Sequence, residues 1–264
     1  MSEMKRFLTA LPLVAALAST ACIDMVTTVH VKADGTGTIV ARMLYTRESQ
    51  QRLQDFAPLL GGGAGRLPKL TEADAAAAAG RFGPGVTFVS ASPINNPDGE
   101  GIEATYAFKD VNQLSLGATP PQLSMPDTSM GAGGPPIRFS LTSEPSVLRI
   151  ETPPPDFSAA AALQPDPQSP LDPNLLSVVR NLIQGAHVAV MVEPSGAIVK
   201  TNAPYVDGPR IVLLDVQIDE LFSETGFARL GTLKSLDDLK AFVKDTPGVK
   251  ITLERDLSIE FRPQ

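Results

Sequence analysis

Alternating apolar and polar residues follow an apolar run near the start of the chain. Residues 29–42 (VHVKADGTGTIVAR) form two alternating runs on either side of Asp34-Gly35-Thr36-Gly37. A period of two is typical of a strand with one buried face, and glycines supply tight turns. The pattern predicts a β-hairpin over residues 29–42.

A second segment, residues 188–201 (VAVMVEPSGAIVKT), has a similar pattern and predicts a second hairpin. The two segments align without gaps, so that Val29, Val31, Gly37, Ile39 and Val40 meet Val188, Val190, Gly196, Ile198 and Val199. Each is followed by two segments with helical patterns, at residues 47–60 and 72–79 in the first half and at 219–224 and 236–245 in the second. Thr71 and Asp74 form a capping-box pattern at the start of one of them.

Both halves then end in similar strand patterns. Residues 83–89 (GPGVTFV) match residues 246–252 (TPGVKIT), and a last strand is expected at 101–108 and at 257–261. The shared order favours two tandem repeats of hairpin, two helices and a strand pair. The alternative is convergence, because glycine turns and Pro-Gly-Val are common. Either way, the expected class is α+β, with antiparallel sheets and a few helices.

The middle of the chain differs from both halves. A short hairpin is expected over residues 137–150, between Pro- and Gly-rich segments at 116–136 and 152–173. Residues 174–184 predict an amphipathic helix. The expected organisation is a signal peptide (1–21), an N-terminal α+β unit (22–116), an insert with a short hairpin, linker and helix (117–185) and a C-terminal α+β unit (186–264).

The N-terminal apolar run has the layout of a secretory signal. Lys5 and Arg6 precede an uncharged, mostly apolar segment at residues 7–18, and Ser19, Thr20 and Ala21 are small. The run is too short to span a bilayer. Cys22, the single cysteine of the chain, follows at once, which rules out a disulfide within the chain.

This segment resembles a bacterial lipoprotein signal, although Ser19 stands where the usual pattern has leucine. The resemblance implies that the peptide before Cys22 is removed and that Cys22 is acylated, which would hold the protein on a membrane of the cell envelope, facing the periplasm or the exterior. Two alternatives are a buried free thiol at Cys22 and cleavage by an ordinary signal peptidase. Enteric lipoproteins that stay in the inner membrane have aspartate directly after the cysteine, and this chain has Ile23 there. Asp24 follows one place later, so the choice of membrane is left open.

Composition narrows the classes of partner. The formal net charge is −7, so nucleic-acid binding is not expected, because that affinity depends largely on lysine and arginine. The chain has no tryptophan and three tyrosines, which weakens the case for a site that stacks on sugars or bases.

Motifs for catalysis or cofactor binding do not stand out. The two histidines, His30 and His187, are interpreted as ordinary strand residues and not as metal ligands or bases. The glycine run at 61–65 lacks the phosphate-loop spacing, and residues 95–101 lack the order of calcium ligands and fit a hairpin turn. No catalytic residue, metal ligand or cofactor is therefore predicted.

The polar loop at residues 202–210 is the remaining candidate for ligand binding. It carries Tyr205, Asp207 and Arg210 between two expected strands. Turn chemistry explains most of its composition, so the loop is a weak candidate.

Two further resemblances connect the chain with known groups of lipoproteins, one over the whole chain and one over its first hairpin. The segment V-x-V-x-x-D-G-x-G at 29–37 and the later Tyr-x-Phe-x-Asp-Val-Asn at 106–112 resemble a group of predicted bacterial lipoproteins of uncharacterised function. The first hairpin also resembles the LppM-type lipoprotein domain of mycobacteria over about 25 residues. The first resemblance implies family membership alone, and the second implies lipid-related work in the envelope.

The expected function is non-enzymatic binding or scaffolding by a lipid-anchored envelope protein. Its partners would be the membrane, through acylated Cys22, and another envelope protein that meets a sheet edge or loop. A second hypothesis is a carrier of lipid or another small hydrophobic ligand, held in an apolar cavity between two sheet halves. A third is an envelope enzyme of unknown class.

Overall fold

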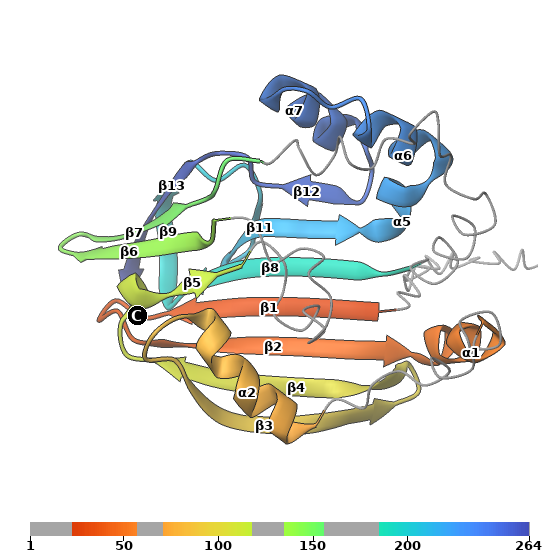
Figure 1. Ribbon diagram of the computed structural model, residues 1–264. Helices are drawn as coiled ribbons and strands as arrows, with labels where there is room; N and C mark the ends of the chain where they lie inside the picture. The colour runs from red at the N-terminus through yellow and green to blue at the C-terminus, as the bar shows by residue number, and fades with distance from the viewer. Residues whose placement is uncertain (1–22, 57–70, 118–134, 156–184, 264) are drawn as a thin grey trace, which may run out of the picture.

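The computed structural model describes residues 23–56, 71–117, 135–155 and 185–263. These residues form an α+β structure with two sheets, which confirms the expected fold class (Figure 1). Sheet A has eight strands and sheet B has five. All described strand pairs are antiparallel except one, the parallel pair of β1 (Ile23–Val31) with β8 (His187–Pro194).

Sheet A has the order β10-β11-β8-β1-β2-β4-β3, and β12 pairs with β11 at one end. Its other strands are β2 (Gly37–Thr46), β3 (Thr87–Asn96), β4 (Gly99–Phe108), β10 (Val206–Asp207), β11 (Arg210–Gln217) and β12 (Val249–Ile251). Sheet B has the order β5-β6-β7-β13-β9, with β5 (Ser115–Leu116), β6 (Ile137–Ser143), β7 (Ser146–Glu151), β9 (Gly196–Thr201) and β13 (Asp256–Pro263).

Short helices connect these strands. The α-helices are α1 (Arg47–Phe56), α2 (Glu72–Ala78), α5 (Ile218–Phe222), α6 (Glu224–Leu230) and α7 (Leu236–Asp245), and the 3-10 helices are η1 (Ala79–Phe82) and η2 (Val111–Gln113). The predicted capping box of α2 is confirmed: the Thr71 hydroxyl accepts from the Asp74 amide at 3.2 Å, and the Asp74 carboxylate accepts from the Thr71 amide at 3.0 Å. Among the described helices, none is long and apolar enough to cross a bilayer.

The first predicted hairpin is confirmed, and it extends further than the pattern indicated. β1 pairs with β2 from Ile23 opposite Tyr45 to Val31 opposite Gly37. The turn needs a residue with positive φ, which Gly35 provides at 83°. The hairpins of β3 with β4 and of β6 with β7 also form. The turn between β3 and β4 is shorter than expected, because it covers only residues 97–98 and the rest of 95–101 belongs to the two strands.

The second predicted hairpin, over residues 188–201, is wrong. β8 and β9 are separated by Ser195 alone and enter different sheets: β8 pairs with β1 and β11, and β9 pairs with β13. One residue is too short for a hairpin loop, which needs at least two. Instead the chain bends after Pro194 and passes from sheet A to sheet B, with Gly196 at a φ of 148°.

The second predicted strand pair is also wrong. β12 pairs with β11 in sheet A, whereas β13 pairs with β7 and β9 in sheet B. The turns before β3 and β12 do correspond, because Gly85 and Gly248 have φ values of 76° and 72°. Sheet A therefore combines strands from both ends of the chain, and the two halves do not each form their own sheet.

Several expectations concern residues outside the described ranges. These are Cys22 and the signal segment before it, the glycine run at 61–65, most of the Pro-rich segments, and the helix expected at 174–184.

The main core lies between one face of sheet A, sheet B and α2 (Figure 1). Every second residue of β1 from Met25 to Val31 is buried, as the alternation predicts. Sheet B contributes a buried row that includes Leu148, Ile150 and Ile259. Tyr106 on β4 joins the sheet to α2, because its ring packs against Phe82 with centroids 4.8 Å apart and its hydroxyl donates to the Ala75 carbonyl at 2.9 Å.

Replacing Gly37 with alanine should destabilise the fold by about 2 kcal/mol or more, because a strained core costs roughly 1–3 kcal/mol. A Cβ at this position would overlap the carbonyl oxygen of His30 and the ring of Phe108. Gly80 provides the matched control: no atom lies within 4 Å of the position that an added methyl group would take, so Gly80→Ala should be neutral or slightly stabilising. Urea unfolding of both variants measures the difference, and equal stabilities would contradict the hairpin geometry.

Candidate functional site

The face of sheet A that points away from the core carries a concentration of polar side chains. The same alternation that buries Met25, Val29 and Val31 places Asp24, Thr28 and His30 on the opposite side. We call this side the outer face. Its members include Asp24, Val26, Thr28 and His30 on β1, Val40 and Arg42 on β2, Glu103 on β4, His187, Met191 and Glu193 on β8, and Arg210 and Asp215 on β11.

One end of the outer face carries a line of alternating charges, which we call the charge row. It runs from β2 to β12 through Arg42, Asp24, His187, Asp215 and Lys250. The Arg42 guanidinium lies 3.7 Å from the Asp24 carboxylate, and Lys250 Nζ lies 3.1 Å from the Asp215 carboxylate. Each carboxylate therefore has a cation on one side and His187 on the other.

His187 lies at the centre of the charge row. Its Nδ1 is 2.8 Å from Asp24 Oδ1 and its Nε2 is 3.0 Å from Asp215 Oδ1, while only 20% of its side chain is exposed. A neutral imidazole donates from one nitrogen alone, so two carboxylate acceptors favour the protonated ring. The hydrogen bond to Asp24 raises the pKa of His187 despite its burial, and the bond to Asp215 adds to that effect.

The same contacts act on Asp215. Burial alone would raise the pKa of this carboxyl, but hydrogen bonds from His187 and Lys250 hold it below its usual range. The register explains why these groups meet, because Asp24 lies opposite His187 in the parallel ladder and Asp215 lies opposite Lys250 in the antiparallel one. The charge row thus joins strands from both ends of the chain.

The geometry of His187 restricts the chemistry it can do. Both ring nitrogens are occupied by carboxylates, so neither is free to bind a metal or to take a proton from a substrate. Within the described ranges, no group of three or more His, Cys, Asp or Glu side chains is arranged to hold a metal ion. The charge row is therefore best explained as a stabilising network.

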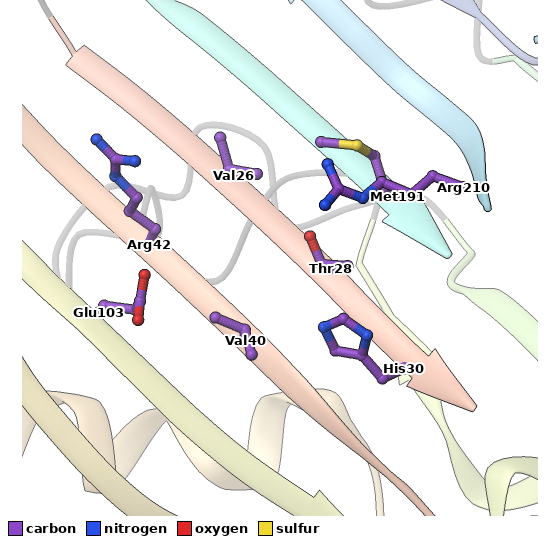
Figure 2. Close-up of a pocket in the computed structure, with 8 residues that line it drawn as sticks. All are labelled: Val26, Thr28, His30, Val40, Arg42, Glu103, Met191 and Arg210. Carbon is purple, nitrogen blue, oxygen red and sulfur yellow. The ribbon is translucent and has the colours of Figure 1, made fainter. Parts of the chain in front are cut away.

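Beyond the charge row, the outer face is hollowed into a concavity of about 290 Å³ (Figure 2). Its floor is formed by Val26, Thr28, Val40 and Met191. Its sides are formed by Arg42, Glu103, His30 and Arg210. Three of these four floor residues are apolar, and such a floor with polar side chains around it is typical of a binding surface.

A second charged cluster lies at the end of the concavity opposite the charge row. Arg210 Nε donates to Glu193 Oε2 at 3.0 Å, and His30 Nδ1 lies 3.9 Å from the same oxygen. The side chains of Arg210 and His30 are 48% and 37% exposed. These exposed fractions show that the concavity is open to solvent at this end.

The candidates from the loop at 202–210 are not brought together as one site. Arg210 lines the concavity, but Tyr205 and Asp207 do not. Asp207 lies opposite Arg210 across the short β10–β11 turn, and the Arg210 guanidinium pairs with Glu193 instead. Cys22 lies outside the described residues, and β1 begins immediately after it at Ile23.

The charge row and most of the concavity are not predicted by the sequence. The local pattern indicates only strand positions for His30 and His187, and for Asp24 only a possible role in sorting between membranes. Alternation along β1 could have placed Asp24, Thr28 and His30 on one face. Their partners on β8 could not have been identified without the register of the parallel β1–β8 pair.

Comparisons with known proteins give one distant likeness. No protein-family model matches the chain, and no curated protein matches it. A search of solved structures finds the folded domain of Mycobacterium tuberculosis LppM, determined by NMR, at a TM-score of 0.34 and 12% identity. The likeness covers 92% of this chain and 91% of that domain.

The charge row should make stability depend on pH. Because the pKa of His187 is raised by folding, its contribution is complete below pH of about 6.5, the usual value in an unfolded chain, and is lost as the pH rises through the folded-state pKa. His187→Gln should lower the free energy of unfolding by about 1–2 kcal/mol at pH 6, since hydrogen bonds to charged groups are worth roughly this much when partly exposed. The difference from wild type should shrink towards pH 9.

NMR can test directly whether the charge row raises the pKa of His187. The chain has two histidines, and the signal that is missing in His187→Gln identifies the His187 ring. The His187 ring should titrate above pH 6.5 in the wild type and at lower pH in Asp24→Asn, which lacks the charged acceptor. A His187 titration at or below 6.5 in the wild type would show that the charge row does not hold the protonated ring.

Proposed function

We propose that this protein is a lipid-anchored envelope protein that acts by binding a partner protein at the outer face of sheet A. Binding is favoured over catalysis because the most buried titratable cluster of the outer face is closed by its own hydrogen bonds. The observation that carries the proposal is the concavity, with its apolar floor and charged sides on a sheet face. Protein–protein interfaces typically have an apolar centre and a polar rim, and arginine is enriched in them.

The position of the predicted anchor supports a binding site on the outer face of sheet A, close to the membrane. β1 starts at Ile23, next to the predicted acylation site, and is a central strand of sheet A. At a rise of about 3.3 Å per residue, Thr28 lies at most about 20 Å from Cys22 along the strand. The concavity would then be tethered close to the membrane while still accessible to a protein in the same compartment.

The form of the concavity supports a protein partner over a lipid. Lipid and other small hydrophobic ligands are usually held in pockets that bury most of their surface. Here the charged side chains around the floor are more than a third exposed, as with His30, Arg42 and Arg210. The charges are also of both signs, so the face has no basic patch for anionic headgroups.

The anchor is tested by the intact mass of the protein isolated from membranes. The wild type should lack residues 1–21 and carry acyl groups on Cys22, whereas Cys22→Ser should lack the acyl mass and leave the detergent-rich phase on phase separation. Ser19→Leu, which restores the usual leucine of the signal, serves as the control and should still be acylated. A mass difference no larger than the exchange of sulfur for oxygen, together with equal partitioning of wild type and Cys22→Ser, would contradict lipid anchoring.

The binding face is tested by photo-crosslinking in cells. A photo-reactive residue at Thr28 or Val40, both in the floor of the concavity, should form an adduct with a specific protein. The same residue at Ser140, an exposed position of β6 in sheet B, is the matched control and should not form that adduct. The same adducts from Ser140, or none from the outer face, would contradict the proposal.

A further inference from the structure

We propose that the occupant of the concavity is an extended segment of the partner protein with two acidic side chains on either side of an apolar one. This inference rests on the proposed function and specifies the chemistry that the outer face recognises. It derives from the positions of two arginines, Arg42 and Arg210, relative to the apolar floor (Figure 2).

The first arginine, Arg210, presents its guanidinium to the concavity. Its Nε is used by Glu193 at 3.0 Å, and Figure 2 shows the rest of the group between Met191 and Thr28. The Thr28 hydroxyl and the His30 ring lie on the same side of the sheet. Guanidinium groups bind carboxylates with two parallel hydrogen bonds, so this end of the concavity fits a carboxylate.

The second arginine, Arg42, has a donor without an acceptor. Its Nε is buried and has no hydrogen-bond partner among the described residues, although the guanidinium lies 3.7 Å from Asp24. The buried Nε is out of reach of a ligand, but the side chain is 38% exposed and its 3.7 Å approach to Asp24 is too long for a hydrogen bond. A carboxylate from a partner would supply an acceptor for the terminal nitrogens.

The spacing of the two arginines defines the segment. Arg42 stands on β2 and Arg210 on β11, three strands apart, but both side chains lean toward β1 between them. The Arg42 guanidinium lies 3.7 Å from Asp24, and Figure 2 shows the Arg210 guanidinium beside Thr28. Four residues of β1 thus separate the two levels, which is about 13 Å at roughly 3.3 Å per residue. The same spacing separates side chains i and i+4 of an extended peptide, and side chain i+2 would then meet Val26 on the floor.

The size of the face favours a single segment over a large folded surface. Five strands about 4.8 Å apart, with about seven residues each, give an area on the order of 500 Å². A stable complex usually buries about 800 Å² on each partner. Because Glu103 and Glu193 offset the two arginines and the chain has a net charge of −7, the attraction is local, and recognition depends on where each carboxylate lies.

Fluorescence anisotropy tests this pattern with the full chain, purified from membranes in detergent micelles. The probe is a labelled, end-blocked pentapeptide with glutamate at positions 1 and 5, valine at position 3 and threonine between them. Its binding should weaken at least about fivefold in Arg210→Gln and in Arg42→Gln, since each loses a charge-assisted hydrogen bond. Arg149→Gln, the same change on an exposed residue of β7 in sheet B, should bind like the wild type.

Comparator peptides test which side chains of the probe peptide are recognised. Replacing both glutamates with glutamine, or the valine with asparagine, should reduce binding, and a peptide with two lysines should not bind. Equal binding of the acidic and neutral peptides, or an equal loss in Arg149→Gln, would overturn the inference. So would displacement of the probe by phosphatidylglycerol vesicles but not by phosphatidylcholine vesicles, because that result would assign the face to anionic lipid headgroups.

The two proposals fail in different ways. If Thr28 forms a specific protein adduct in cells but that adduct is unchanged in Arg210→Gln and Arg42→Gln and no acidic peptide binds, the binding face stands and the acidic segment is wrong. If the outer face forms no adduct and binds no peptide, both are wrong. Matched thermal unfolding of Arg42→Gln and Arg149→Gln shows that a loss of binding is not a loss of fold.

Discussion

The parallel pairing of β1 with β8 is the contact on which the rest of the structure depends. It joins the N-terminal strands of sheet A to those from the C-terminal part of the chain, and its partners Asp24 and His187 are 163 residues apart in the sequence. Backbone hydrogen bonds alone would allow the ladder to slip, and a slip of one residue would turn the inner side chains outward. The register is fixed from both sides, by buried Val29 and Val192 on the inner face and by Asp24 and His187 on the outer face.

This junction has consequences for both faces of sheet A. On the inner face it brings Val190 and Val192 beside Val29 and Val31, so residues from distant parts of the sequence share one core with sheet B. On the outer face it brings together Asp24, His187 and Asp215, and no local sequence pattern indicates that these residues are in contact. The concavity is therefore a product of the junction, because its floor has contributions from β1, β2 and β8.

How far the sequence predicts this structure depends on whether each feature is local. The hairpin at residues 29–42, the cap at Thr71 and the helix over 236–245 were predicted correctly, since turn glycines, caps and periodicity act within a few residues. Residues 188–201 look like the first hairpin in composition, yet Pro194 and a one-residue connection send the chain into sheet B. Similar local patterns therefore led to different pairings, and register, which decides the charge row, cannot be obtained from one sequence.

Hydrogen-bond satisfaction separates the stabilising part of the outer face from the part suited to binding. In the charge row the carboxylate oxygens already accept from neighbours, as Asp215 shows with His187 and Lys250, so a ligand would have to replace bonds already made. The two arginines that flank the floor keep open donors, because the Arg42 guanidinium approaches Asp24 only to 3.7 Å and Arg210 uses Nε on Glu193 while the rest of its guanidinium faces the floor. The carboxylates and His187 of the charge row therefore gain little from a ligand, whereas the two arginines gain most, which is why the binding proposal is placed between them.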